Sequence, residues 1–367
     1  MKKHSKNSQK VERKKQWKER PAMVVGLDLG DRHSHYWMLN VEGDMVEEGK
    51  IPSTEKALSK HFEGQPRQRI AMECGTHSPW VSRLLERWGH QVIVANARQI
   101  PALTASESRN DRNDAEKLAE LAYSDPELLK PIQHRSVERQ RDLNLIQVRD
   151  TLVRARTMII NSVRGLVKSA GGRLPKCEAS AFATQVKTEI PAELKEAATP
   201  LLEQTQMLTV QILSLEKQIE KLAEKYPEIV TLRTVPGVGP LIASAYVLTL
   251  DRPEVFSNSR QAGAFLGLRP RQKDSGNSHP QCRISKNGNR YLRRLLVQGA
   301  HYVLGRFGKD SALRRWGLQL ATSGGKRGKK RAVVAVARKL AVLLHRLWKT
   351  GENYQAFPES DTVRLSA

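Results

Sequence analysis

The chain has 367 residues, and its 62 Lys and Arg against 38 Asp and Glu give a formal net charge of +24 and a pI of about 10.1. This length fits two or three domains, and the large positive charge makes a polyanion, first of all nucleic acid, the natural partner. No apolar run approaches the roughly 20 residues of a membrane-spanning helix and no signal peptide opens the chain, so we expect no membrane partner and a cytoplasmic protein. Cys74, Cys177 and Cys282 lack the spacing of a zinc site or a disulfide framework.

Residues 1–20 are rich in Lys and Arg and nearly devoid of apolar side chains. Such a segment cannot bury enough surface to fold alone, so we expect a disordered basic arm. Composition leaves open whether the arm binds nucleic acid or only aids solubility.

The next segment alternates between apolar patterns typical of strands and a pattern typical of an amphipathic helix. Strands are expected over 23–30, 36–41, 69–73 and 92–95, with an amphipathic helix over 79–88. The order strand, hairpin partner, strand, helix, strand predicts an α/β domain with a mixed sheet.

Four carboxylates stand at the ends of these elements. Asp28 and Glu73 each close an apolar strand, and Asp111 and Asp114 stand at the start of a helix expected over 115–123. Residues three apart share one helix face, and ligands of α/β sheets gather at the carboxyl ends of strands. We therefore expect the four acids to point at one place.

Uncompensated carboxylates beside apolar strands are costly unless a cation meets them, and Mg²⁺ prefers such oxygen ligands. Two Mg²⁺ ions about 4 Å apart would flank a scissile phosphate. Asp31 and Glu107 are nearby substitutes that the sequence leaves open.

Two heptad patterns follow, and they predict a helical coiled coil that fits an intramolecular hairpin and a dimerisation stalk equally well. Residues 171–199, with two prolines, interrupt the arms as a loop or small helical turn. The other faces of the first arm carry arginines, as a solvated surface or one that meets RNA. The first arm repeats Leu145, Leu152, Ile159 and Leu166 with Val148, Ala155 and Ser162 between them; the second repeats Leu201, Leu208, Leu215 and Leu222 with Thr205, Ile212 and Ile219; the arginines are Arg149, Arg154, Arg156 and Arg164.

The last segment opens with glycines in residues 234–240, ahead of a small-residue helix over 241–248. This is typical of a helix-hairpin-helix turn, in which Gly237 and Gly239 would let backbone N–H groups approach a phosphate. The same turn also occurs as plain structure.

Ser275-Gly276 lies in a polar loop, where such a pair is usually only a turn. The cations that follow raise the alternative of a nucleophilic serine, because charge developing on phosphorus needs preorganised cations. A further basic block, residues 326–331, precedes an apolar helix over 333–347 and favours general phosphate attraction. The cations after the serine are Arg283, Lys286, Arg290, Arg293 and Arg294.

At these residues the chain resembles the DEDD-type insertion-sequence transposases, which are related to the Piv DNA invertase and include the bridge-RNA-guided, or seek-RNA-guided, recombinases. The resemblance covers nearly everything after the basic arm. Its motifs are residues 26–29, 72–75, 111–115, 236–240, 267–270, 275–276 and 283–289.

The resemblance implies a fold of the α/β plus α class. It places an RNase-H-like (Holliday-resolvase-like) mixed-sheet domain at 21–128, a helical coiled-coil region at 129–228, and a mainly α C-terminal transposase domain at 229–355. The basic arm then covers 1–20 and a tail covers 356–367.

It further implies a recombinase with composite sites in a tetramer built from homodimers, with double-stranded target and donor DNA and a non-coding guide RNA as partners near the bacterial or archaeal nucleoid. Carried over, Asp28, Glu73, Asp111 and Asp114 hold Mg²⁺ and Ser275 is the nucleophile that forms a phosphoserine. Gly237, Gly239, Arg283, Lys286, Arg290, Arg293 and Arg294 would contact nucleic acid.

The sequence departs from the family pattern at two places. Arg109-Asn110 stands where Lys-Thr is common, and Asp274 stands where a second serine is frequent, with Ser278 three residues on. Two rival hypotheses remain: a hydrolytic, metal-dependent junction resolvase in which Ser275 is structural, and a basic architectural or RNA-chaperone protein without activity.

Overall fold

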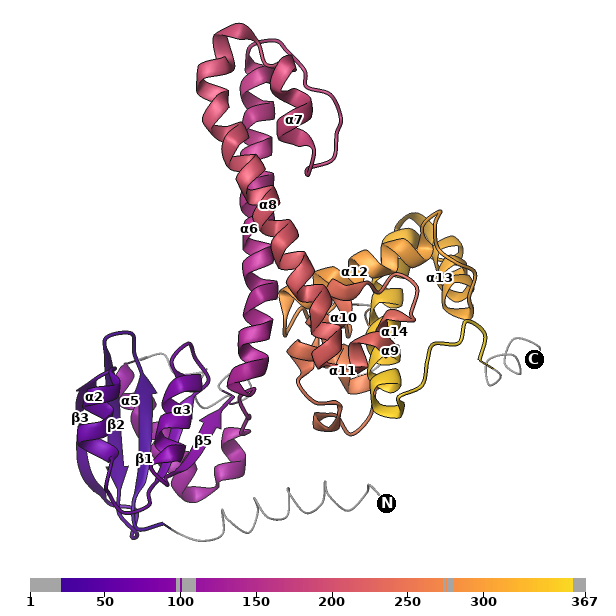
Figure 1. Cartoon of the computed structure of the whole chain (residues 1–367). Helices are drawn as coiled ribbons and strands as arrows, with labels where there is room; N and C mark the ends of the chain where they lie inside the picture. The colour runs from indigo at the N-terminus through magenta and orange to yellow at the C-terminus, as the bar shows by residue number, and fades with distance from the viewer. Residues whose placement is uncertain are drawn as a thin grey trace. The chain divides into compact units, whose positions relative to one another are not determined.

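A computed structural model describes residues 21–96, 100, 110–272, 275, 280 and 282–358, and only the backbone of Lys326. The predicted basic arm, Glu107 and most of the predicted tail lie outside the described residues. The chain divides between His134 and Arg135 into two compact units, the indigo-to-magenta and the magenta-to-yellow parts of Figure 1. Within the described residues, no helix is long and apolar enough to cross a membrane.

The first unit is built on a five-stranded sheet in the order β3-β2-β1-β4-β5. Strands β1, β2 and β3 pair antiparallel, whereas β4 and β5 run parallel to β1, so the predicted mixed sheet is confirmed. The strands are β1 Val24–Leu29, β2 His33–Leu39, β3 Met45–Pro52, β4 Arg69–Glu73 and β5 Gln91–Ala95.

Helices cover both faces of this sheet (Figure 1). On one face, Val24 and Ala71 pack against the apolar side of α5 (Asp111–Ser124), which the 3₁₀ turn η2 (Pro126–Leu129) follows. On the other face, Val25 and Ile70 pack with α2 (Glu55–Phe62) and α3 (Ser78–Arg87). Successive strand residues therefore serve opposite cores, as the pleat requires.

Helix α5 lies unusually close to the central strand because β1 contains a glycine at the crossing point. A Cβ built on Gly26 would lie 1.9 Å from the Ala115 carbonyl oxygen and 2.5 Å from the Ala119 nitrogen. Ala115, Leu118, Ala119 and Ala122 form the buried side of the helix, and three of these four are alanines. Small residues on both elements thus set the position of the helix that carries Asp111 and Asp114.

We predict that Gly26→Ala destabilises the protein by at least about 2 kcal/mol, because the added methyl meets helix backbone that cannot turn aside. Urea denaturation followed by circular dichroism measures the change. Gly75→Ala is the matched control, since no atom would lie within 4 Å of its new Cβ, and we expect it to stay within about 0.5 kcal/mol of wild type. Equal stability of the two variants would contradict the close contact.

Strand β3 and helix α2 have no counterpart in the elements expected from the sequence. Most β3 residues are exposed, and the strand lies at the sheet edge with Glu47, Glu48 and Lys50 along it. An edge strand with charged side chains avoids pairing with other chains but carries no apolar alternation that a pattern search would detect.

The second unit begins with two long helices, α6 (Val137–Ser169) and α8 (Lys195–Lys225), which run side by side as an antiparallel hairpin (Figure 1). The link between them holds the short helix α7 (Phe182–Val186) and two 3₁₀ turns, η3 (Lys187–Glu189) and η4 (Ala192–Leu194), which agrees with the helical alternative predicted for this interruption. Of the two arrangements predicted for the heptad arms, the structure shows the intramolecular hairpin.

The residues of α6 that pack against α8, which we call the seam, differ from the residues of the predicted heptad. Ile146, Ile160, Val163 and Val167 are buried, whereas the predicted Val148 is 49% exposed. On α8 the prediction was better, and the inner positions are buried as expected. The α6 seam was missed because two of its positions, with the same heptad spacing, are arginines, which a search for apolar repeats passes over. The buried inner positions of α8 are Thr205, Ile212 and Ile219.

Three arginines of α6 hold the hairpin together. Arg149 pairs with Glu216 of α8, and Arg156 donates a hydrogen bond of 3.1 Å to the Thr209 hydroxyl. Arg164 lies 5.1 Å over the Phe182 ring and donates to backbone carbonyls of the link. Three of the four arginines therefore make internal contacts, so the expected solvated or RNA-facing surface is wrong for them; Arg154 is exposed and pairs with its neighbour Asp150.

The rest of the second unit is a helical bundle around α10, whose residues from Ala243 onward are all buried. Arg135 Nε donates 2.7 Å to the Leu248 carbonyl oxygen and so ties the start of α6 to the end of α10. The bundle contains α9 (Glu228–Arg233), α10 (Pro240–Leu250), η5 (Pro253–Val255), α11 (Arg260–Phe265), α12 (Arg290–Leu304), α13 (Ala312–Ser323), η6 (Gly325–Arg327) and α14 (Gly328–Thr350).

Candidate active site

Two of the predicted acids lie side by side at the carboxyl edge of the sheet. Strands β1 and β4 are parallel neighbours with Leu27 opposite Met72, and the next residues along each strand are Asp28 and Glu73. On its other side, Asp28 lies opposite His35 of β2. The strand register by itself therefore brings two carboxylates to one edge.

The other two acids occupy the first turn of α5. The Asn110 side chain caps this helix by accepting hydrogen bonds from the backbone nitrogens of Arg112 at 2.8 Å and Asn113 at 3.2 Å. The helix therefore begins at Asp111, four residues before the expected start, and the positive end of its dipole favours the charges of Asp111 and Asp114.

A second contact fastens the same turn to the sheet. Arg112 Nε donates a hydrogen bond of 2.8 Å to Glu48 Oε2, and its guanidinium lies 5.2 Å over the Trp37 ring. Because Glu48 and Trp37 belong to neighbouring strands, the helix start is held over the sheet edge that carries Asp28.

Asp28 feels the charges of the other three acids. Burial, and then the charges of Asp111, Asp114 and Glu73, raise the pKa of Asp28 from its usual 3.8 to about 7. Asp114 Oδ1 is buried without a hydrogen-bond partner. Carboxylates that repel one another, one of them with an orphaned oxygen, are the chemistry of a site that a cation would complete.

Charges act on one another over longer distances than a bond between a metal ion and its ligand spans. Among the described residues, no three His, Cys, Asp or Glu side chains stand together closely enough to hold one metal ion. The donor set of four carboxylates nevertheless suits a hard divalent cation, which would relieve the repulsion felt by Asp28.

Two histidines border the acids and were not singled out from the sequence. His35 Nε2 lies 3.8 Å from Asp111 Oδ2, and His77 Nε2 lies 3.6 Å from Asp31 Oδ1. Asp31 thus faces His77, with a side chain that is 96% exposed, and it is absent from the charges that act on Asp28. His35 lies one residue before the strand expected over 36–41, which was expected to pair with the strand that contains Asp28, and this position was the signal that could have revealed it.

We predict that the metal-free protein loses stability between pH 4 and pH 7, because the folded Asp28 carboxyl keeps its proton to about pH 7 while the unfolded one releases it near 3.8. Asp28→Asn should remove this loss and make the variant more stable than wild type at pH 8, by about 2 kcal/mol after allowance for solvent screening. Urea denaturation in a chelating buffer at several pH values provides the test.

Asp31→Asn is the control for that experiment, since its exposed carboxylate does not act on Asp28. It should keep the wild-type pH dependence. An Asp28→Asn variant whose stability changes with pH as steeply as wild type would show that the pKa of Asp28 is not raised.

Ser275 lies in the connection between two paired segments of the second unit. Arg271 N donates 3.0 Å to the Arg283 carbonyl, Ser285 N donates 2.9 Å to the Arg269 carbonyl, and Pro270 bridges Ile284. We call residues 267–272 and 282–288 the ribbon. Ser275 is exposed, while Asp274, Gly276 and Ser278 lie outside the described residues.

The base of the ribbon is locked against α12 and the end of α11. Gly267 and Gly288 adopt φ of +68° and +80°, and a Cβ on Gly288 would lie 2.0 Å from the Phe265 carbonyl oxygen. Arg293 Nη1 donates to the carbonyls of Leu266 at 2.9 Å and Asn287 at 3.0 Å. Gly288 thus makes room for the chain's own backbone, and Arg293 orients the ribbon.

The remaining predicted nucleic-acid contacts divide into two groups. Arg283, Lys286 and Arg290 are exposed. Arg294 pairs with Asp150 of α6 and lies 5.0 Å from the Tyr291 ring centroid.

The helix-hairpin-helix glycines also differ in their surroundings. Gly237, with φ of +81°, packs against α12, since its Cβ would lie 2.8 Å from the Gly299 carbonyl oxygen. Gly239 precedes the first residue of α10 and faces open space. Packing therefore explains why residue 237 is a glycine. Of the two glycines, only Gly239 lies exposed at the start of a helix, where a phosphate could approach.

The two groups of predicted site residues belong to different compact units: the four acids to the first and Ser275 to the second. A family model of DEDD transposases of the IS110 type matches residues 25–171, and the transposase IS116/IS110/IS902 family matches residues 230–316. These matches, together with the acids at the edge of the mixed sheet, place the chain in the class of DNA-modifying enzymes of the transposase type.

Individual relatives agree. The chain is 33% identical over 298 residues to a transposase for insertion sequence element IS1111A of Coxiella burnetii, covering 78% of this chain and 79% of that protein. It is 34% identical over 251 residues to a probable family 20 transposase of Pseudomonas aeruginosa, covering 66% and 73%. A pilin gene-inverting protein of Moraxella lacunata is 28% identical over 137 residues, covering 36% and 41%. The chain belongs to the IS110 family of insertion-sequence transposases.

Proposed function

We propose that this transposase is an RNA-guided recombinase that cuts, exchanges and rejoins DNA strands to move its own insertion element. The observation that carries the proposal is the group of carboxylates at the sheet edge, where burial and the charges of three neighbouring acids raise the pKa of Asp28 and one oxygen of Asp114 lacks a hydrogen-bond partner. A purely architectural nucleic-acid-binding protein would gain nothing from four acids that repel phosphate.

Asp28, Glu73, Asp111 and Asp114 would hold Mg²⁺, two ions per site. Bound there, the ions would polarise a scissile phosphate and stabilise its developing charge. The Asn110 cap and the contact of Arg112 with Glu48 keep the two α5 acids over the strand ends.

Ser275 would supply the nucleophile. Its hydroxyl oxygen attacks phosphorus and loses its proton, the bond from phosphorus to the leaving oxygen of the strand breaks, and that oxygen leaves as a hydroxyl. A hydroxyl of the exchanged strand then attacks the phosphoserine and returns the serine to its free form. The bond energy is kept in the phosphoserine, so no nucleotide cofactor is required.

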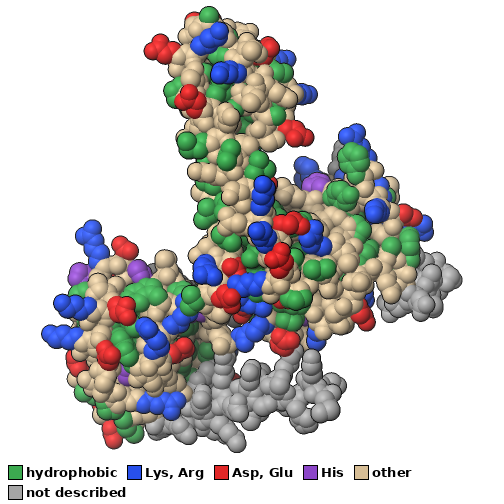
Figure 2. Space-filling view, in the orientation of Figure 1, with side chains coloured by type: hydrophobic (Ala, Val, Ile, Leu, Met, Phe, Trp, Pro, Cys, Tyr) green, Lys and Arg blue, Asp and Glu red, His purple; other side chains and the backbone are tan. Residues whose placement is uncertain are grey.

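The acids and the serine would meet between subunits of a tetramer built from homodimers. The heptad stripe predicted on α6 supports this arrangement, because it lies beside the seam that α8 covers and part of it is exposed. Figure 2 shows hydrophobic side chains along the hairpin surface. Val148 of this stripe is 49% exposed.

Double-stranded target and donor DNA and a non-coding RNA from the element are the proposed partners. The RNA would select the target by base pairing, while the protein reads backbone and shape. The relative named for pilin gene inversion supports strand exchange, since inversion of a segment requires that both of its ends be cut and rejoined.

We predict that the full-length protein, with its copurified RNA and Mg²⁺, forms a covalent adduct with labelled DNA carrying target and donor sequences. Denaturing gels detect the adduct, and peptide mapping locates it. Ser275→Ala should abolish the adduct, whereas Ser278→Ala, the matched control, should retain it. Glu73→Gln and a chelator should each reduce adduct formation by at least about 100-fold.

Each rival hypothesis has its own outcome. Free DNA ends without a protein-linked strand would favour a hydrolytic resolvase with a structural serine. Unchanged DNA in every reaction, with binding intact after Asp28→Ala, would favour an architectural protein. An adduct that survives Ser275→Ala would move the nucleophile to another residue.

We predict that Val148→Glu combined with Leu152→Glu weakens dimerisation at least about 10-fold, because two charges would enter the stripe that the partner subunit covers in the proposed dimer. Sedimentation velocity measures the association. Thr157→Glu is the control, because Thr157 lies on the exposed side of the same helix. Wild-type association of the double variant would place the subunit contact elsewhere.

A further inference from the structure

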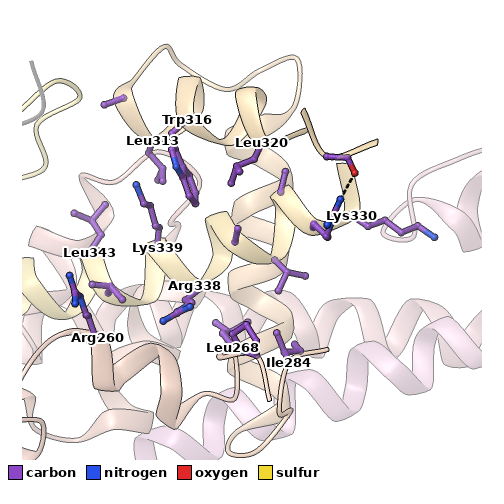
Figure 3. A pocket seen from close by; sticks show the side chains of 18 of the residues that line it. Arg260, Leu268, Ile284, Leu313, Trp316, Leu320, Lys330, Arg338, Lys339 and Leu343 are labelled. Carbon is purple, nitrogen blue, oxygen red and sulfur yellow. Dashed lines mark hydrogen bonds between the residues drawn. The ribbon is translucent and has the colours of Figure 1, made fainter. Parts of the chain in front are cut away.

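The second unit contains a large groove. Its volume is about 1930 Å³, and its walls are α13, α14 and the ribbon, with the segment after α14 closing one end. Figure 3 shows Trp316 and Leu320 on one wall, Arg338 and Lys339 on the α14 side, and Leu268 and Ile284 from the ribbon. Small-molecule sites occupy roughly 300–1,000 Å³, so the space suits part of a macromolecule.

The groove is strongly and uniformly basic. Nine of its lining residues are Lys or Arg, and none of the lining residues within the described chain is Asp or Glu. The molecular face in Figure 2, by contrast, shows acidic and basic side chains interspersed. The basic block of residues 326–331 contributes Arg327, Lys330 and Arg331 to the groove, and the ribbon contributes Arg283 and Lys286.

The floor between these cations is apolar. Leu268 and Ile284 line it from the ribbon, and Leu313, Trp316 and Leu320 line it from α13. Trp316 is partly exposed, and Lys339 Nζ lies 3.9 Å from the centroid of its ring. Lys339 therefore covers one face of the ring by a cation–π contact, and a base that stacked on this face would displace it.

We infer that this groove binds an unpaired nucleic-acid strand, with phosphates on the Lys and Arg side chains and bases against Trp316 and the aliphatic floor. The inference rests on the proposed function, in which strands are separated for exchange, and it adds a holding site for one of them. Arg283 and Lys286 belong to the ribbon, and Ser275 lies in the connection between the two segments of that ribbon, so the groove and the proposed nucleophile share one structural element.

Two features favour a single strand over other polyanions. A duplex presents phosphates and keeps its bases stacked inside, so none of its bases would pack against the apolar floor. A single strand offers both charge and bare aromatic faces, and aromatic side chains between cations are the usual platform for it. An acidic polypeptide would match the charge but supplies no flat ring for Trp316.

The test measures binding of short oligothymidylate to the full-length protein by fluorescence anisotropy at fixed salt. Trp316→Ala should weaken binding about 5- to 150-fold, the range for loss of one stacked base. The same variant should bind an abasic strand of equal length, or a duplex, as wild type does. Lys330→Ala should weaken binding to every ligand and lower the salt dependence by about one phosphate contact.

Phe307→Ala is the matched control, because Phe307 is an aromatic side chain with an arginine over its ring that does not line the groove. It should bind as wild type. Trp316→Phe should restore most of the affinity if stacking is the cause, and thermal melting of each variant separates lost binding from lost folding.

Unchanged oligothymidylate binding by a folded Trp316→Ala variant would overturn the inference, as would equal affinity of wild type for the abasic strand. Competition by polyglutamate as strong as by oligothymidylate would assign the groove to an acidic polypeptide instead. None of these results would alter the phosphoserine adduct at Ser275, so failure here is distinct from failure of the proposed function.

Discussion

The close crossing of α5 over β1 is the constraint on which the acid site depends. Gly26 leaves room for the backbone of Ala115 and Ala119, and the helix therefore lies directly on the central strand. Because Asp111 and Asp114 occupy the first turn of this helix, the same crossing sets where they stand relative to the strand ends. A larger residue at position 26 would move two of the four carboxylates at once.

That placement has an electrostatic cost. Asp28 loses water and meets three further carboxylates, which raise its pKa to about 7, and Asp114 keeps an oxygen without a partner. A sequence selected for stability alone would not gather acids in this way, whereas a site that binds a cation needs them together. The second unit shows the opposite electrostatics, with a groove that gathers cations around an apolar floor.

Many polar side chains outside these sites stabilise the fold rather than bind a ligand. Arg149 and Arg156 lie in the seam of the hairpin, and Arg293 holds the ribbon to α12. In a protein with this much positive charge, such arginines would readily be taken for nucleic-acid contacts. Their partners, a carboxylate, a hydroxyl and two backbone carbonyls, could be known only once the helices were packed.

The sequence alone was sufficient for the mixed sheet, the two long helices and the acids at element ends, because apolar periodicity and strand-ending carboxylates are local signals. It missed β3 and α2, whose residues carry little apolar alternation, and it chose the wrong stripe on α6. Only the tertiary structure decided which face of α6 meets α8, why Gly26 is required, and that three cations of residues 326–331 line the same groove as the ribbon. Those facts arise from contacts between residues far apart in the chain, which no local pattern encodes.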